Sequence, residues 1–403
     1  MPMYKYVGRT PNGLLKKGTI ESASKSQAII AIKEKGISPR EITETKATLL
    51  NRDISFGSNS VKTQDFVIYC RQFATLIRAG VSIVEATNIL ALQTDSKGLK
   101  KALFHVEADL KEGKAFSDAA EKQSKFFPPL FVNMIRAGEA TGNIDETLDR
   151  LAVYYEKQNN LKKKVQSTLA YPAVLLVVII AVVIFLMVSI VPTLTATFAS
   201  FGGELPAITK LVVTMSEFIQ SSWWLGLLIL ALIIGVFVFL YRSNQRFQYA
   251  THVVLFRLPI FGKLLQKAVI ARMTRTLSSL VSSSVPILQA LTIVERVVGN
   301  PVIGQVILAS RDSLEQGRAL SEPLKRSWVF PPLVTQMIAI GERTGQLDFM
   351  LAKVADFYEE DVDRTVDTLK SLIEPIMIVI LAFVVGFIVI AIMVPMFSIY
   401  TEM

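Results

Sequence analysis

Residues 127–148, FPPLFVNMIRAGEATGNIDETL, return later in the chain as residues 330–351, FPPLVTQMIAIGERTGQLDFML. The two stretches lie 203 residues apart and share a Gly-Glu-x-Thr-Gly element followed by an aspartate. The shared positions are Gly138, Glu139, Thr141, Gly142 and Asp145 in the first copy, and Gly341, Glu342, Thr344, Gly345 and Asp348 in the second. Self-similarity at a fixed offset indicates an internal duplication.

The duplication extends beyond these two stretches. The same offset relates Pro172 to Pro375 and Pro192 to Pro395, and upstream an offset of 204 relates Arg71 to Arg275 and Gly113 to Gly317. One residue has therefore been gained or lost between the copies. The copies run in the same order, and each ends in an apolar stretch bracketed by prolines.

Three apolar stretches of 19 residues contain no charge, namely residues 173–191, 223–241 and 376–394. At about 1.5 Å per residue, such a helix spans a hydrocarbon core of about 30 Å. A buried helix of a soluble protein rarely lacks a polar face over this length. We therefore predict transmembrane helices at residues 171–192, 223–241 and 375–395.

Basic residues flank these spans on one side of the membrane. They are Arg150, Lys157, Lys162, Lys163 and Lys164 before the first span, and Arg242, Arg246, Arg257, Lys263 and Lys267 after the second. The excess of basic residues in cytoplasmic segments places both groups inside the cell, and residues 193–222 and 396–403 outside. The first thirty residues contain no signal-peptide core, which predicts a cytoplasmic N-terminus.

The soluble segments complete a mainly α membrane protein. Residues 63–170 and 242–374 predict two homologous cytoplasmic helical bundles of about six helices each. Thr63 is a candidate N-cap, Gly80 ends the helix that follows, and Ser82 opens the next one with a capping-box pattern.

The first 45 residues have a different pattern. Short alternating runs predict strands near Tyr4, near residues 19–21 and near residues 40–42, with an amphipathic helix at residues 24–35. We interpret residues 1–45 as a small α/β module and residues 46–62 as a linker.

Two motifs have both a structural and a functional interpretation. The Gly-Glu-x-Thr-Gly elements are typical of helix ends and starts, with contact to a partner as the alternative. Small residues four apart, Ala231 with Gly235 and Ala382 with Gly386, allow close packing of membrane helices. That packing would lie within the protomer, between protomers or against another membrane helix.

The sequence contains few of the residue patterns that a catalytic site needs. The chain has no G-x-x-x-x-G-K-[ST] phosphate-binding loop, and its two histidines, His105 and His252, have no metal-ligand spacing. The acidic run Asp356, Glu359, Glu360, Asp361 and Asp363 is typical of a solvated helix face. Since these patterns offer no catalytic site, we predict that the chain is not an enzyme. The net charge of +9 is concentrated beside the membrane without interleaved aromatic residues, so we also predict no direct binding of nucleic acid.

Nearly the whole chain resembles the platform protein family of type II secretion protein F and type IV pilus protein PilC, including its competence-pseudopilus members. The resemblance rests on Tyr4-Lys5-Tyr6, residues 71–76 (RQFATL), both Gly-Glu-x-Thr-Gly elements and Tyr171-Pro172 at the first span. It implies a homo-oligomeric platform in the cytoplasmic membrane that couples a cytosolic hexameric ATPase to insertion or removal of pilin or pseudopilin subunits. It also implies contact with other membrane assembly components.

Some secretion members of that family carry a calcium site in the first cytoplasmic domain. The resemblance places its acidic positions at Asp95, Asp149 and Val153 of this chain, and the third has no carboxylate. Since calcium takes six or more oxygen ligands, we predict no cofactor, with Asp95 and Asp149 as the residues that calcium would use.

Other membrane functions remain open at this point. A small-molecule transporter would need polar residues inside the spans, and a receptor would have only residues 193–222 and a short tail outside. The sequence does not distinguish a pilus from a secretion or competence pseudopilus.

Overall fold

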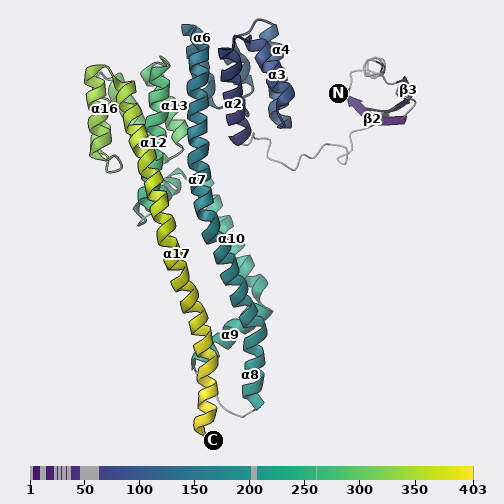
Figure 1. Cartoon of the computed structure of the whole chain (residues 1–403), viewed down its shortest axis with the longest axis vertical. Helices are drawn as coiled ribbons and strands as arrows, with labels where there is room; N and C mark the ends of the chain where they lie inside the picture. The colour runs from purple at the N-terminus through teal and green to yellow at the C-terminus, as the bar shows by residue number, and fades with distance from the viewer. Residues whose placement is uncertain are drawn as a thin grey trace. The chain divides into compact units, whose positions relative to one another are not determined.

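The computed structural model describes residues 3–9, 15–21, 25, 29, 33, 38–45, 63–200, 207–259 and 261–402. Contacts divide the chain into residues 1–59 and residues 60–403. Figure 1 labels the elements of both units.

The N-terminal unit contains a three-stranded antiparallel sheet in the order β2-β1-β3. Its strands are β1 (Met3–Arg9), β2 (Leu15–Glu21) and β3 (Ser38–Thr45). The central strand pairs Tyr6 with Gly18 on one side and with Ile42 on the other, and both Tyr4 and Tyr6 are buried. Of the predicted helix at 24–35, only residues 25, 29 and 33 are described, and all three are helical. The predicted linker, residues 46–62, lies outside the described residues.

The first copy is a bundle of six helices within residues 63–200. They are α2 (Thr63–Arg78), α3 (Ile83–Gln93), α4 (Lys97–Lys111), α5 (Phe116–Lys122), α6 (Pro129–Thr141) and α7 (Ile144–Phe185). The predicted cap is confirmed, because the Ser82 hydroxyl accepts a hydrogen bond from the Glu85 backbone at 3.3 Å. Aromatic rings fill the core. The ring centroids of Phe66 and Tyr155 lie 4.9 Å apart, and those of Phe73 and Phe116 lie 5.2 Å apart.

The second copy repeats this order after α11 (Gln245–Arg257). Its helices are α12 (Phe261–Ser282), α13 (Ile287–Val298), α14 (Pro301–Glu315), α15 (Ser321–Arg326), α16 (Pro332–Thr344) and α17 (Leu347–Glu402). The buried apolar residues of both bundles form one continuous cluster. The two copies therefore fold as a single body with a shared hydrophobic core.

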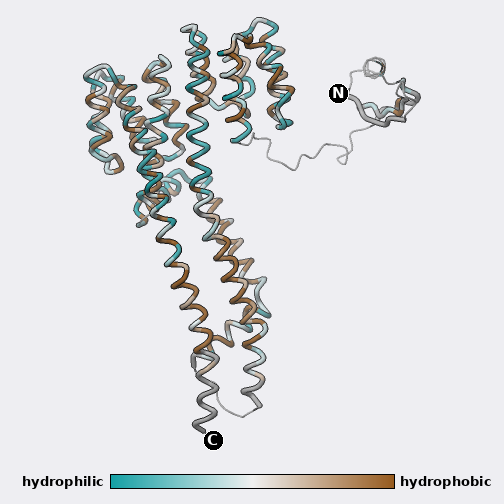
Figure 2. Tube along the Cα trace, viewed as in Figure 1, coloured by the Kyte–Doolittle hydropathy of each residue, from teal (hydrophilic) through white to brown (hydrophobic). Residues whose placement is uncertain are grey.

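The last helix of each bundle is also its membrane span. Helix α7 passes Pro172 without interruption, and α17 continues from Leu347 past Pro375. Figure 2 shows hydrophilic and hydrophobic residues alternating along the upper part of each helix, with hydrophobic residues predominating further down. Three helices are long and apolar enough to cross a membrane, as predicted. The predicted boundaries at 170/171 and 374/375 fall inside continuous helices, so no hinge loop separates bundle from span.

The first span ends in the π-helix η2 (Leu186–Ile190) and the start of α8 (Val191–Ser200). The described residues between it and the second span, α10 (Trp223–Ser243), are largely helical and include the rest of α8 and α9 (Ala207–Ser221). The Met187 carbonyl in the π-helix accepts hydrogen bonds from the Ser216 hydroxyl and the Gln220 side-chain amide. This backbone carbonyl is therefore paired even where the regular α-helix is interrupted. Met187 also packs with Val212 and with Ile388 of α17.

Candidate functional site

The Gly-Glu-x-Thr-Gly element ties α6 to its neighbours in the first copy. A Cβ atom on Gly138 would lie 2.7 Å from the Thr147 hydroxyl, so only glycine allows α6 to approach α7 this closely. The Glu139 carboxylate accepts hydrogen bonds from the backbone N–H groups of Phe116 (2.6 Å) and Ser117 at the start of α5. Gly142 ends α6 with φ of 75°, a conformation that glycine adopts without strain.

The second copy repeats this arrangement. A Cβ atom on Gly341 would lie 2.9 Å from the Leu347 backbone, and Gly345 ends α16 with φ of 72°. The Glu342 carboxylate accepts hydrogen bonds from the backbone of Leu320 (2.6 Å) and Ser321. The threonine hydroxyls of both elements donate to carbonyls one turn back, Thr141 to Ala137 and Thr344 to Ile340. The glutamates thus join segments 21 to 23 residues apart, a contact that the motif alone did not predict.

In each repeat, an arginine of the bundle forms hydrogen bonds with the helix that enters the membrane. Arg71 of α2 donates to Glu156 of α7, with Nε 2.6 Å from Oε1, and to Asp149 at 3.0 Å. In the second copy, Arg275 of α12 donates to Glu359 of α17 at 2.7 Å and also to Asp356. Fork-shaped pairing of this kind fixes orientation as well as distance. We call these two networks the arginine clamps.

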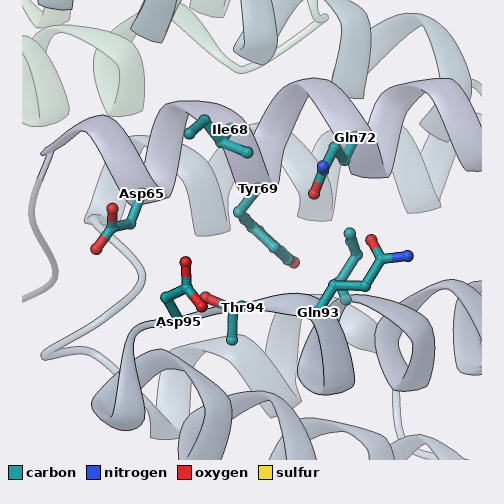
Figure 3. A pocket seen from close by; sticks show the side chains of 8 residues that line it. Asp65, Ile68, Tyr69, Gln72, Gln93, Thr94 and Asp95 are labelled. Carbon is teal, nitrogen blue, oxygen red and sulfur yellow. The ribbon is translucent and has the colours of Figure 1, made fainter.

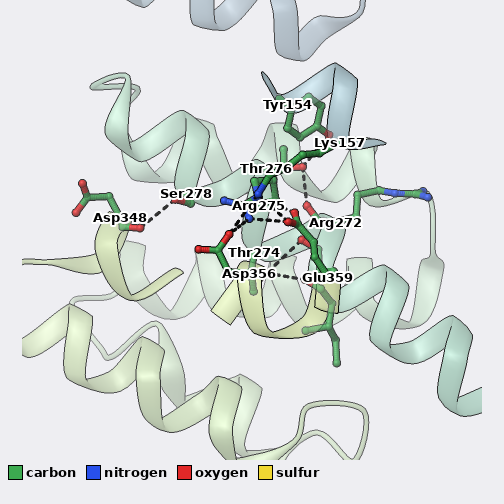
Figure 4. Close-up of polar contacts among 12 residues, drawn as sticks. Tyr154, Lys157, Arg272, Thr274, Arg275, Thr276, Ser278, Asp348, Asp356 and Glu359 are labelled. Atoms are coloured by element: carbon green, nitrogen blue, oxygen red, sulfur yellow. Dashed lines mark hydrogen bonds and ion pairs between the residues drawn. The ribbon is translucent and has the colours of Figure 1, made fainter. Parts of the chain in front are cut away.

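A polar seam joins the two copies beside the second clamp (Figure 4). Lys157 of α7 lies 2.9 Å from Glu359 and 3.3 Å from Asp356. The buried Tyr154 hydroxyl hydrogen-bonds the Thr276 hydroxyl at 3.0 Å. These contacts connect residues more than a hundred positions apart, so they bind the copies to each other.

The acidic run on α17 is therefore more than the solvated face that the sequence predicted. Within it, Asp361 pairs with Lys267 at 2.9 Å and Asp363 pairs with Lys164 at 3.2 Å. The basic partners lie on helices distant in sequence, which is why spacing within the run gave no sign of them. Only Glu360 remains in a local pair, with Arg364 one turn later.

Charge pairing shifts the pKa values of two clamp carboxylates. The hydrogen bond from Arg71 lowers the pKa of Glu156, and partial burial only partly opposes it. Partial burial alone would raise the pKa of Asp356, but hydrogen bonds from Arg275 and Lys157 outweigh it and lower that pKa. Both carboxylates are thus held in the charged form.

The two aspartates implied for calcium, Asp95 and Asp149, contact different residues. Asp95 lines a pocket of about 240 Å³ with Asp65 and the buried Tyr69, whose hydroxyl has no hydrogen-bond partner (Figure 3). Asp149 instead accepts contacts from Arg71 at 3.0 Å and Arg78 at 2.8 Å.

Two cations already pair with the Asp149 carboxylate, and the Val153 side chain offers no oxygen, so these side chains do not fit calcium as a set. Among the residues that the structure describes, no three or more His, Cys, Asp or Glu side chains group as metal ligands. The absence of a cofactor stays a prediction.

The two glycines of the small-residue pairs in the spans, Gly235 and Gly386, face open space within the protomer. No atom beyond the glycine's own helix lies within 4 Å of a Cβ position at Gly235 or Gly386. Their partners Ala231 and Ala382 lie one turn earlier in α10 and α17. Close packing at these glycines inside the protomer is thus not observed, which leaves a second copy or another membrane helix as the predicted contact.

The glutamate of the repeated element gives a first prediction. Glu139→Ala leaves two backbone N–H groups of α5 without their acceptor, so unfolding should become easier by about 1–3 kcal/mol. Glu342→Ala should behave alike, and the double variant should be close to additive. Thermal unfolding of the full chain in detergent measures the effect. Glu146→Ala, which removes only an exposed pair with Arg150, is the matched control, and an equal loss there would contradict the assignment.

The second clamp gives a prediction about acid stability. Because folding lowers the pKa of Asp356, its contribution is complete above the ordinary carboxyl pKa of about 4 and declines as pH falls through the lowered value. Melting temperatures between pH 6 and pH 3 should therefore fall less steeply in Arg275→Gln than in the unmodified chain. Arg364→Gln, whose pair with Glu360 is exposed, is the control. Parallel curves for all three proteins would show that the clamp does not stabilise the fold.

Comparison with known proteins agrees with the duplication. The family described as Type II secretion system (T2SS), protein F matches residues 69–192 and again residues 273–395. The N-terminal domain of Type II secretion system protein F matches residues 1–43. The two central matches begin 204 residues apart and end 203 apart, as the internal repeat does.

Curated relatives align along nearly their whole length. A protein named Type IV pilus assembly protein PilC from Myxococcus xanthus is 36% identical over 98% of this chain and 94% of its own. One of the same name from Thermus thermophilus is 37% identical over 99% and 98%. Type II secretion system protein F from Vibrio cholerae is 32% identical over 98% of both chains. This chain therefore belongs to the type II secretion system protein F family, alongside relatives named for type IV pilus assembly.

Proposed function

We propose that this chain is the platform protein of a type IV pilus, type II secretion or competence-pseudopilus machine in the inner (cytoplasmic) membrane. In this role it couples a cytosolic hexameric ATPase to the insertion of pilin or pseudopilin subunits into a filament, or to their removal. Two similar helical bundles whose final helices continue into membrane spans carry the proposal. The names of the relatives support it.

The proposed orientation puts both bundles in the cytoplasm and the C-terminus outside. Basic residues on the bundle side of the spans support it, including Lys162 to Lys164 before the first span and Arg242 after the second. Two bundles on one side would give the cytosolic partners a continuous surface, because the polar seam holds the copies together.

The coupling we propose is mechanical. The sequence contains no phosphate-binding loop, so the energy comes from a separate ATPase and the chain itself makes and breaks no covalent bonds. A force applied to a bundle reaches the bilayer through α7 and α17, since each is one hydrogen-bonded helix across the boundary. The arginine clamps keep these helices fixed to their bundles.

We assign ATPase contact mainly to the N-terminal module and the first bundle, and pilin contact to the membrane helices. Small residues at Gly235 and Gly386 leave room there for a neighbouring helix, from a pilin or from a second copy. Co-purification of the ATPase with a chain lacking residues 1–62 would remove the N-terminal module from this assignment.

The coupling predicts that helix stiffness between bundle and span is required. Replacing Lys370, Ser371, Leu372 and Glu374 of α17 by glycine costs about 4 kcal/mol of local helix stability relative to alanine at the same positions. These side chains are exposed, so both variants lose the same contacts. We expect the glycine variant to assemble at least tenfold fewer filaments, or to secrete as much less, than the alanine variant.

Membrane insertion and protein abundance should be equal in the two variants and serve as controls. Equal assembly by both would contradict mechanical coupling through α17. Failure of the alanine variant as well would show that the replaced side chains, and not the stiffness of the helix, are what assembly needs.

A further inference from the structure

A cleft opens in the second bundle where α14 ends and α15 and α16 meet. Its volume is about 560 Å³, and Arg318, Lys325 and Arg343 lie on its lining together with Ser321 and Glu342. A cleft of this size holds a short peptide segment and greatly exceeds a single inorganic ion. We call it the basic cleft.

Among the described residues, the cations of the basic cleft have no acidic partners. None of Arg318, Lys325 and Arg343 forms an ion pair there. The Arg318 side chain donates to the side-chain oxygen of Gln316, and the Arg343 side chain donates to the Ala339 carbonyl at 3.4 Å. Glu342 supplies one carboxylate, but its oxygens already accept bonds from Leu320 and Ser321. Three exposed cations and one engaged carboxylate leave an excess of two positive charges.

The first bundle shows what this scaffold looks like when the charges are balanced. There Lys114, the counterpart of Arg318, pairs with Asp109 at 2.5 Å and Glu112 at 2.6 Å. Glu121, the counterpart of Lys325, pairs with Arg136 at 2.7 Å.

The second bundle has lost all three of these carboxylates. Ser313, Gln316 and Lys325 stand where the first bundle has Asp109, Glu112 and Glu121. The backbone arrangement is common to both, because Glu139 and Glu342 make the same contacts with α5 and α15. The surplus positive charge is therefore specific to the second copy and is not required by the fold.

The position of the basic cleft selects the kind of anion that can reach it. Arg343 lies at the end of α16, and α17 then runs from residue 347 to the apolar stretch that starts at residue 376, roughly 40 Å along the helix axis. Within residues 60–403, Figure 1 places α16 far from the C-terminal part of α17. Lipid headgroups of the same membrane lie too far away, so the occupant comes from solution.

We propose that the basic cleft docks an acidic peptide segment of a cytosolic protein, whose Asp and Glu carboxylates pair with Arg318, Lys325 and Arg343. The two arginines offer planar forks suited to carboxylates, and the lysine offers a point charge. The inference rests on the proposed cytoplasmic placement of the second bundle. It implies that the two copies, similar in fold, receive different partners.

The test uses the full chain in detergent and a fluorescent peptide of alternating Glu and Ser, with a Gln-Ser peptide of equal length for comparison. Lys325→Glu combined with Ala339→Arg recreates the Glu121–Arg136 pair of the first bundle, so this variant should fold. We expect the variant to bind the Glu-Ser peptide at least tenfold more weakly than the unmodified chain. The unmodified chain's binding should weaken as salt increases.

Lys101→Gln is the matched control, because it changes the net charge by the same single unit on the first bundle and should leave binding unchanged. Equal binding of the two peptides, or full binding by the Lys325→Glu/Ala339→Arg variant, would overturn the proposal. Displacement of the peptide by phosphatidylglycerol vesicles or by millimolar phosphate would do so too, by assigning the cleft to a lipid or a free anion. The test measures peptide binding and not filament assembly. A failure of the docking proposal can therefore be distinguished from a failure of the proposed platform role.

Discussion

The unbroken hydrogen-bonded helix that leads from each bundle into its membrane span is the constraint on which this molecule depends. In α7 and α17 the residues that close the bundle core and the residues that face lipid belong to one ladder of backbone bonds. Inside a bilayer such a ladder cannot open cheaply, because unpaired backbone groups find no water there. A displacement of either bundle must therefore move its span, and the proposed platform role follows from that connection.

The duplication then doubles this connection and joins its two halves. The bundles share one apolar cluster, and Lys157 and Tyr154 of the first copy reach Glu359 and Thr276 of the second. The partly exposed ion pairs contribute modestly to stability, but their geometry fixes how the helices sit against one another. The two copies share this scaffold but differ in surface charge. The first bundle pairs its cations with carboxylates at the position where the second bundle has the basic cleft.

Much of the fold could be predicted because its signals are local. Uncharged runs of 19 residues and the Ser82 cap each depend on neighbouring residues, and the recurrence of Gly-Glu-x-Thr-Gly is visible by comparing two short stretches of sequence. The continuity of α7 and α17 was missed, since Pro172 and Pro375 mark breaks in soluble helices but are tolerated in membrane helices. The roles of Glu139 and of the acidic run on α17 were also missed, because their partners lie far away in the sequence.

The distance across the boundary of α17 tests the central claim most directly. Spin labels at Glu360→Cys and Ile378→Cys lie on one face of the helix on either side of Pro375, at exposed positions, in a chain whose buried Cys70 is replaced by alanine. A continuous helix predicts one narrow distribution with a backbone separation of about 27 Å in double electron–electron resonance. A broad distribution, or one centred well below that value, would show a hinge at the membrane surface and contradict the account.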